Sequence, residues 1–340
     1  MRIHSGIAAS ARRLTRGALA IGNFDGVHLG HRGLFAAAAA AARRQGGPSC
    51  ALTFEPHPAR LLAPDYAPPL ICTPARKREL LAQSGVDDLI EQPFDRAFAQ
   101  TEPDTFVDLL LATGVATIVV GHDFTYGRER RGTVETLRNA LEQCGVRLQV
   151  VPPITVNGLV VSSTKIREFT LEGRVEAAAQ LLGRPFDLDG DVVRGVGRGR
   201  KLGWPTANIR TEAELLPGVG VYAVRAQLVE AVSVPAAPAR SDEPRQSAIE
   251  YVPPKLGAPL PGAANLGLNP TFRDDAHAGS GREPLMLEVH LFDFDRDLYG
   301  RTLRVAFVHR LRDERRFPNV EALKAQIERD VASARRLLGS

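Results

Sequence analysis

The fold of the first half of the chain is decided by residues 22–31, which read GNFDGVHLGH. This stretch follows a short apolar run, residues 18–21, and leads into an Ala-rich segment, residues 30–44, that ends at a Gly-Gly-Pro breaker. A strand, a glycine-containing turn and a helix in that order are typical of a parallel sheet flanked by helices. In such sheets ligands bind at the carboxyl ends of the strands, where a helix N-terminus offers N–H groups and a positive dipole to phosphate.

Two histidines, His28 and His31, lie three positions apart where the predicted helix begins. In the first helical turn this spacing puts both imidazoles on one side, and Gly30 keeps the backbone open to a bulky ligand. Two donors that converge on phosphate oxygens can stabilise the charge that develops as a nucleophile attacks the α-phosphorus of ATP. A single histidine near a turn is usually structural, but the pair in this setting favours chemistry. A zinc site is disfavoured because H-E-x-x-H is absent.

The pattern of short apolar runs alternating with helical stretches continues to about residue 185, which predicts a parallel α/β domain over residues 1–185. Further strands are expected at residues 50–54, 88–90, 117–120 and 148–151, and further helices from Thr73 to Gly85 and at residues 175–182.

After Pro185 the pattern changes to short β-like runs separated by glycines, prolines and acidic turns. Strands are expected at residues 191–194, 220–226, 285–292 and 302–308, and a closing helix at residues 320–338. Strands without intervening helices predict a small antiparallel barrel in a second domain, residues 186–340. Residues 230–262 are rich in Pro, Ala and Ser, which predicts an exposed, poorly ordered insertion.

Composition agrees with a globular, two-domain protein. The chain has 340 residues, of which 44% are hydrophobic, and a formal net charge of +4 that suits anionic small molecules and argues only weakly for nucleic acid. The three cysteines lack metal-ligand spacing, which favours a reducing cytoplasm. No signal peptide and no run of about 18 apolar residues is present, so we expect neither export nor a membrane partner.

A second candidate site lies in residues 194–208, which read RGVGRGRKLGWPTAN. Four glycines let the backbone wrap closely, and four cations favour polyphosphate, although such a loop is often only a solvated turn or a nucleic-acid contact. A Walker loop is absent. Thr206 and Asn208 favour a functional role for residues 194–208, because two neutral oxygen ligands on one face of a strand suit Mg²⁺ held jointly with ATP phosphates.

The base for this second site is expected to be Glu288. In residues 287–291, LEVHL, alternation puts Glu288 and His290 on one face of a strand and the apolar residues on the other. The competing interpretation is an exposed glutamate on a half-buried strand. We expect Glu288 to help a hydroxyl group attack the γ-phosphorus of ATP.

Three further segments could line the first crevice. Residues 162–167, SSTKIR, open a helix with hydroxyl groups and an arginine one turn later, which forms either an anion-binding corner or a plain N-cap. Residues 54–58, FEPHP, and residues 121–127, GHDFTYG, follow predicted strands. Their aromatic and proline content suits a planar ring system, although core or turn roles are equally possible.

Together these motifs resemble the HxGH nucleotidyltransferase superfamily, and more closely the bacterial bifunctional riboflavin kinase/FMN adenylyltransferases, or FAD synthetases. The resemblance covers nearly the whole chain; it includes residues 217–224, 264–267, 270–272 and 292–317. It implies a Rossmann-like HxGH nucleotidyltransferase domain followed by a riboflavin kinase-type antiparallel β-barrel with a terminal helix. The implied activities are phosphorylation of riboflavin to FMN in the C-terminal module and adenylylation of FMN to FAD, with release of pyrophosphate, in the N-terminal module.

The resemblance also implies residue roles. The catalytic residues are His28, His31 and Glu288, and the Mg²⁺ ligands are Thr206 and Asn208. Flavin is held by Pro56, His57, Pro58, Asp123, Phe124 and Tyr126, with Asp123 where Asn is commoner in the family. ATP is bound in the first site by Gly22, Asn23, Phe24, Asp25, Gly30, Ser162, Ser163, Thr164 and Arg167, and in the second by Gly197, Arg198, Gly199, Lys201, Gly203 and Pro205.

The partners implied are ATP, riboflavin and FMN, with neither nucleic acid nor membrane, for a chain that is a monomer or a weak homo-oligomer. Two alternatives stay open at this point. In the first, one site is degenerate and a single activity is left. In the second, the basic loop at residues 194–201 belongs to a nucleic-acid-binding protein. The second alternative is disfavoured because no aromatic stacking array accompanies the loop.

Overall fold

The computed structural model describes residues 1–195, 199, 203–230, 248–268 and 285–340. Contacts divide these residues into two units. The first holds residues 1–69, 74–162 and 248–253, and the second holds residues 70–73, 163–230 and 254–340, within the described ranges. The division between residues 162 and 163 differs from the boundary at residues 185 and 186 that the sequence predicted.

The first unit is built on a seven-stranded sheet with the order β14-β1-β4-β3-β2-β5-β8. Every neighbouring pair is parallel except β1 with β14, which confirms the predicted parallel α/β domain. The strands are β1 (Arg2–Ser5), β2 (Ala18–Ile21), β3 (Ser49–Glu55), β4 (Asp88–Pro93), β5 (Thr117–Gly121), β8 (Arg147–Val151) and β14 (Ile249–Glu250). The sequence did not predict the two short strands β1 and β14.

The strand order places one loop at a special position. After β2 the chain moves outward through β3 and β4, and it then returns to the other side of β2 to form β5 and β8. The point where the direction reverses is where doubly wound sheets bind ligands, outside the carboxyl ends of the strands. Residues 22–28 leave β2 at this point, and residues 122–127 follow the neighbouring strand β5.

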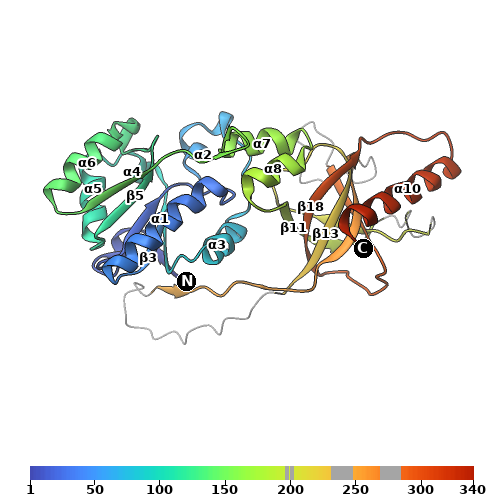
Figure 1. The fold of residues 1–340 in the computed structure, drawn as a ribbon, viewed down its shortest axis with the longest axis horizontal. Helices are drawn as coiled ribbons and strands as arrows, with labels where there is room; N and C mark the ends of the chain where they lie inside the picture. The colour runs from blue at the N-terminus through green and yellow to red at the C-terminus, as the bar shows by residue number, and fades with distance from the viewer. Residues whose placement is uncertain (196–198, 200–202, 231–247, 269–284) are drawn as a thin grey trace. The chain divides into compact units, whose positions relative to one another are not determined.

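Helices cover both faces of this sheet (Figure 1). One face is covered by α1 (Leu29–Gln45), and the other by α5 (Pro103–Ala112) and α6 (Val134–Gln143). Other elements of this unit are α2 (Pro58–Leu62), α3 (Pro74–Gln83), α4 (Arg96–Ala99), β6 (Thr125–Tyr126), β7 (Gly132–Thr133), β9 (Thr155–Val156), β10 (Leu159–Val160) and three short 3-10 helices, at Ala8–Ser10, Pro64–Tyr66 and Arg128–Arg130.

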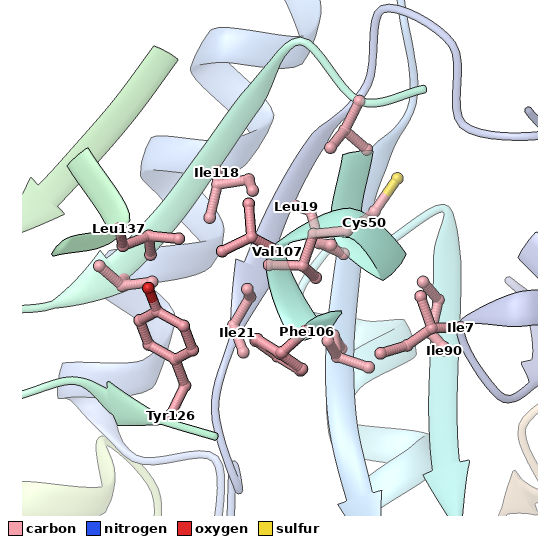
Figure 2. Close-up of a cluster of buried hydrophobic side chains, with 14 of the residues drawn as sticks. Ile7, Leu19, Ile21, Cys50, Ile90, Phe106, Val107, Ile118, Tyr126 and Leu137 are labelled. Atoms are coloured by element: carbon pink, nitrogen blue, oxygen red, sulfur yellow. The ribbon is translucent and has the colours of Figure 1, made fainter. Parts of the chain in front are cut away.

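The main core of the unit lies between the sheet and α5 with α6 (Figure 2). Alternate strand residues such as Leu19, Ile21 and Ile118 point into it and meet Phe106 and Leu137 from these helices. The residues between them in the strands, many of them alanines, face the opposite side. An Ala-rich α1 can therefore approach the sheet closely there, with Ala38, Ala41 and Ala42 buried.

The second unit is a closed barrel of six antiparallel strands, as the sequence predicted (Figure 1). The strand order is β13-β16-β17-β12-β11-β18, and pairing of β18 with β13 closes it. The elements are α7 (Ser163–Leu171), α8 (Val175–Leu182), β11 (Phe186–Val193), β12 (Ala207–Arg210), β13 (Gly220–Glu230), β15 (Lys255–Leu256), β16 (Leu260–Leu268), β17 (Leu285–Leu291), β18 (Thr302–Arg312) and α10 (Val320–Leu338).

Helices pack on the outside of this barrel. Ala334 and Leu338 of α10 are buried in a cluster with Ala223 and Phe292. Arg310 of β18 donates a hydrogen bond from Nη1 to the carbonyl oxygen of Glu172, between α7 and α8, at 2.6 Å. This bond and the packing of α8 on β18 explain why α7 and α8 belong with the barrel, although the sequence predicted them as the end of the first domain.

Most of residues 230–262 were predicted to form an exposed, poorly ordered insertion, and the described part of this segment holds short strands. Residues 231–247 lie outside the described residues. Of the remainder, β14 pairs antiparallel with β1, β15 pairs with β13, and β16 is a barrel strand. Backbone pairing stabilises these strands despite their largely exposed, Pro-rich sequence. No helix in the described ranges is long and apolar enough to cross a membrane.

Candidate active sites

The loop between β2 and α1 has an unusual backbone. Phe24 and Val27 have positive φ angles of 51° and 43°, and Gly26 has a φ of 77°. The left-handed region is unfavourable for residues with side chains, particularly a β-branched valine. Both side chains are fully buried, which holds the backbone in this conformation. Because its ring is buried, Phe24 can contribute to a ligand site only through its backbone groups and through the residues that pack against the ring.

The structure brings His28 and His31 into direct contact, whereas the sequence predicted only that both imidazoles lie on one side of the helix. His28 is the N-cap of α1, because its Nδ1 accepts a hydrogen bond from the backbone N–H of His31 at 3.3 Å. The two imidazole rings are stacked, with centroids 3.5 Å apart and planes at 15°. Since Nδ1 of His28 is an acceptor, the proton of the neutral ring lies on Nε2. The edge of His31 also packs against Phe24, with centroids 5.3 Å apart.

Gly30 leaves room for this arrangement. A Cβ atom at position 30 would lie 3.0 Å from Cε1 and 3.1 Å from Nδ1 of His28. Such contacts are tighter than ordinary van der Waals distances, so a side chain here would require the His28 ring to shift by a few tenths of an ångström. The glycine between the two histidines thus serves the geometry of the pair as well as access to the helix N-terminus.

The chemical state of His31 is set by its surroundings. Burial lowers its pKa well below the usual value, and the neighbouring His28 and Lys77 lower the pKa further. His31 is therefore neutral near pH 7. Its Nδ1 is buried and has no hydrogen-bond partner within the described ranges. A buried polar atom without a partner is costly in a folded protein, and a bound phosphate or water would satisfy it.

The two loops predicted to hold the flavin follow β3 and β5. In the first, the Glu55–Pro56 peptide bond is cis, and His57 caps α2 by accepting a hydrogen bond from the N–H of Ala59 at 3.2 Å. In the second, Asp123 is largely exposed. Because parallel strands end at the same edge of a sheet, both loops lie at the edge that carries residues 22–31.

Tyr126 has a different setting from the other predicted flavin residues. Its ring is buried in the main core, and its hydroxyl lies 3.3 Å from Oγ1 of Thr136 (Figure 2). Phe124, which is partly buried, stacks on it with ring centroids 5.8 Å apart. Tyr126 can therefore support Phe124, and Phe124 is the aromatic residue of this loop better placed for a ligand.

The hydroxyl-rich segment predicted to bind ATP begins a helix, as expected. Ser163, Thr164 and Arg167 lie in the first part of α7, where Thr164 is exposed and the other two are partly buried. Ser162 precedes the helix and is assigned by contacts to the first unit, while α7 is assigned to the second. Lys165 forms an ion pair with Glu168 at 2.8 Å on the helix surface.

In the second unit three polar side chains form one row across neighbouring strands. Asn208 of β12 is opposite Glu288 of β17, and Glu288 is opposite Asn265 of β16. Directly opposite residues in an antiparallel pair project on the same side of the sheet. On β17 the apolar residues Leu287 and Val289 are buried, and Glu288 with His290 forms the other, partly exposed face, as the sequence predicted.

Two glycines of the glycine-rich segment, Gly195 and Gly199, lie against the two predicted metal ligands. The side chain of Asn208, which is buried, lies directly against the Cα of Gly195, and the side chain of Thr206 lies against Gly199. The backbone N–H of Trp204 donates a hydrogen bond to the carbonyl oxygen of Gly199 at 2.9 Å. Of the other predicted ATP residues, Gly197, Arg198 and Lys201 lie outside the described residues.

Two further predicted residues close this loop. The carbonyl oxygen of Pro205 lies 2.8 Å from Nδ1 of His290, which carries the proton in this contact because a carbonyl can only accept. Gly203 is exposed and has a φ of 97°, so it provides a turn that other residues rarely adopt. His290 thereby ties the loop to the same face of β17 that carries Glu288.

Replacing Gly195 by alanine is expected to lower kcat/KM for the predicted phosphorylation of riboflavin by about 10-fold to 100-fold, because the new methyl group would displace the Asn208 carboxamide. Steady-state kinetics with riboflavin and ATP would measure the effect. Gly257→Ala is the matched control, since its Cβ would meet its nearest neighbour at an ordinary 3.5 Å. Equal rates for both variants and the unmodified chain would contradict the role of the loop.

The residues present fit a magnesium ion. No cluster of three or more His, Cys, Asp or Glu side chains that could hold a metal occurs in the described parts of the chain. Mg²⁺ does not need such a cluster, because it is commonly held by one or two protein oxygens together with substrate phosphates. Thr206 and Asn208 supply oxygens of this kind next to a loop rich in glycine and basic residues.

Three residues of these sites were missed by the sequence analysis. Gly195 was quoted only as part of the loop, and Asn265 only within a matching segment, yet each lies against a predicted functional residue. Lys77, which influences His31, comes from α3 and carries no motif signal. A polar Asn in the otherwise apolar run AANLGL was the one available sign for Asn265.

Comparison with known families divides the chain in two. Residues 10–165 match the family described as FAD synthetase, and residues 182–338 match the family described as riboflavin kinase. The first match contains both histidines, and the second contains Thr206, Asn208 and Glu288.

Individual relatives match over nearly their whole length. A bifunctional riboflavin kinase/FMN adenylyltransferase from Pseudomonas fluorescens is 36% identical over 325 residues, which cover 95% of this chain and 93% of the relative. A protein with the same description from Escherichia coli (strain K12) is 36% identical, and the match covers 94% of this chain and 92% of the relative. Another, from Bacillus subtilis (strain 168), is 33% identical, and the match covers 93% of this chain and 90% of the relative.

A solved structure shares the fold. It is described as a macrolide-efflux protein from Streptococcus pneumoniae, and it matches with a TM-score of 0.77 and 30% identity over 94% of this chain and 95% of its own. That description names a transport function, whereas the two family matches name enzymes.

Proposed function

From the premise that this chain belongs to the bifunctional riboflavin kinase/FMN adenylyltransferase family and has both activities, we propose that His28 and His31 serve the adenylyl transfer and Glu288 the phosphorylation. The observation that carries the first assignment is the stacked histidine pair at the N-terminus of α1, at the point where the strand order reverses. The second rests on the row formed by Asn208, Glu288 and Asn265.

In the adenylyl transfer, a phosphate oxygen of FMN attacks the α-phosphorus of ATP. A new O–P bond forms, the bond from the α-phosphorus to the bridging oxygen breaks, and pyrophosphate leaves. The phosphates of ATP lie at the positive end of α1. Nε2–H of His28 donates to a phosphate oxygen that gains charge in the transition state, and the neutral His31 supports that ring by stacking and offers its own ring nitrogens.

The substrates of this site are held by the loops around the histidines. Gly22, Asn23, Asp25 and Ser162, which belong to the first unit, contact ATP. The assignment of Ser163, Thr164 and Arg167 to ATP stays a prediction of the sequence. Pro56, His57 and Pro58 from one loop, and Asp123 and Phe124 from the other, contact the flavin of FMN. The shared sheet edge that carries residues 22–31, 54–58 and 121–127 supports this assignment.

In the phosphorylation of riboflavin, Glu288 accepts the proton of the ribityl 5′-hydroxyl as its oxygen attacks the γ-phosphorus of ATP. The bond from the γ-phosphorus to the bridging oxygen breaks, and ADP leaves. Positioning and electrostatics supply most of the rate in such a transfer. The glycine-rich loop, including Gly197, Arg198, Gly199, Lys201, Gly203 and Pro205, wraps the phosphates of ATP.

Thr206 and Asn208 would hold Mg²⁺ together with these phosphates, and the bound ion would supply screening of the negative charge of ATP. Gly195 and Gly199 have no Cβ atom, which leaves room for the observed positions of the Asn208 and Thr206 side chains. His290 holds the end of the loop through Pro205.

The chain acts in the cytoplasm as a monomer or a weak homo-oligomer, with small molecules as its partners. Cys50, Cys72 and Cys144 are thiols rather than parts of a disulfide, which suits a reducing compartment. Sedimentation velocity over a range of concentrations measures the oligomeric state. The nucleic-acid alternative has no support, because the basic loop lies inside the riboflavin kinase match.

Mass-spectrometric product analysis tests the two assigned activities together. With riboflavin, ATP and Mg²⁺ we expect FMN to form first and FAD to follow, and with FMN and ATP we expect FAD and pyrophosphate. Omission of Mg²⁺ with added chelator should stop riboflavin phosphorylation. FMN without any FAD would mean that the first site is degenerate, which was the single-activity alternative.

A further inference from the structure

A buried lysine outside the recognised motifs lies beneath the first site. Lys77 of α3 has a side chain that is only 9% exposed. Its Nζ donates hydrogen bonds to Oε2 of Glu55 at 3.1 Å and to Oγ1 of Thr53 at 3.5 Å. Lysine is rarely buried unless it is paired, because removing an ammonium group from water is costly. A lysine at such a place therefore has a specific role in the structure around it.

Both partners of Lys77 lead to loops of the first site. Oγ1 of Thr53 donates a hydrogen bond to the carbonyl oxygen of Asn23 at 3.0 Å, and Asn23 lies in the loop that carries the histidines. Glu55 is the last residue of β3 and immediately precedes Pro56 in the other loop. One ammonium group thus connects the loop proposed for ATP with the loop proposed for the flavin.

Lys77 also acts on the histidine pair through its charge. The positive charge of Lys77 contributes to lowering the pKa of His31, after burial and the effect of His28. Removal of this charge is therefore expected to change the titration of His31.

We propose that Lys77 is a positioning residue for adenylyl transfer, which holds residues 22–31 and residues 54–58 in a fixed relation through Thr53 and Glu55. This inference rests on the proposed location of the adenylyl-transfer site at His28 and His31. Preorganised loops lower the cost of bringing ATP and FMN together, and a displacement of about 1 Å costs roughly 10²-fold in rate. A buried ion pair that served stability alone could be replaced without a change in substrate binding.

The variant Lys77→Met tests the proposal in the full-length chain, because methionine fills a similar space and removes the charge. We expect kcat/KM for FMN in FAD formation to fall by about 10-fold to 100-fold, with a raised KM for FMN. We also expect the titration midpoint of His31, measured by NMR with labelled histidine, to move to higher pH, since a cation that disfavours the protonated ring is lost. Riboflavin phosphorylation by the same molecules should be unchanged.

Two companion variants separate positioning from general effects. Arg78→Met removes the neighbouring ion pair of α3, in which Nε of Arg78 lies 2.7 Å from Oε1 of Glu91, and it should leave FAD formation within about twofold. Glu55→Gln removes the partner of Lys77 but keeps the ammonium group. It should raise the KM for FMN without moving the His31 titration to higher pH.

The outcomes are distinguishable. Unchanged FMN kinetics and an unchanged His31 titration in folded Lys77→Met overturn the proposal, and if that variant does not fold, an unchanged KM in Glu55→Gln overturns it. If replacing both His28 and His31 by alanine, the double histidine variant, abolishes FAD formation while Lys77→Met and Glu55→Gln show normal kinetics, only the role of Lys77 is refuted. Retained FAD formation in the double histidine variant refutes the proposed site itself.

Discussion

Replacing His28 and His31 together by alanine is expected to lower the rate of FAD formation from FMN and ATP by at least about 10³-fold, because donors aimed at developing phosphate charge are lost. The single variants should each show a large part of this loss. His28→Ala also removes the N-cap of α1, and His31→Ala removes the ring on which His28 stacks. The losses of rate in the two single variants will therefore not add up to the loss in the double variant. Separation of FAD from FMN by chromatography after a timed reaction measures the rate.

The same molecules contain the control for this experiment. Formation of FMN from riboflavin depends on residues of the barrel unit, so it should proceed at the unmodified rate in the double variant. A folded double variant that loses both activities would refute separate sites. A double variant that still makes FAD at the normal rate would show that the stacked pair is structural.

Glu288→Gln should reduce riboflavin phosphorylation by about 10²-fold to 10⁴-fold, the usual range for loss of a general base. Glutamine keeps the size of the side chain and its place on β17 between Asn208 and Asn265, but it cannot accept the hydroxyl proton. FAD formation from supplied FMN should be unchanged. Initial rates of ADP release with riboflavin measure the first effect.

A chemically equal change elsewhere in the same unit provides the comparison. Glu328→Gln alters an exposed residue of α10 and should leave both activities as they are. If Glu288→Gln phosphorylates riboflavin as fast as Glu328→Gln, Glu288 is not the base, and another group on that face of β17 must be sought.

The elements with a strong periodic signal were predicted well. The bounds of β2, α8 and α10 agree with the expected residues 18–21, 175–182 and 320–338. In these elements apolar residues recur with the period of a buried strand or of an amphipathic helix, and glycines or N-capping residues mark the ends. Local signals and tertiary packing agree there.

Elements stabilised mainly by pairing were missed. Neither β1 nor β14 has more than four residues, and each is a strand because a neighbour supplies hydrogen bonds: β1 pairs with β4, and β14 pairs with β1. A Pro-rich, exposed segment such as residues 248–262 gives no local sign of such partners. Strand formation in these places depends on residues far away in the chain.

The sequence by itself determined the two classes of domain, the histidine pair at a helix start and the alternation that exposes Glu288, because each of these depends on residues a few positions apart. Tertiary structure alone decided that Asn265 lies opposite Glu288, that Gly195 lies against Asn208 and that Lys77 reaches Thr53 and Glu55. The reason is physical: strand register and the packing of α3 bring together residues more than ten positions apart, and no short-range pattern encodes those distances.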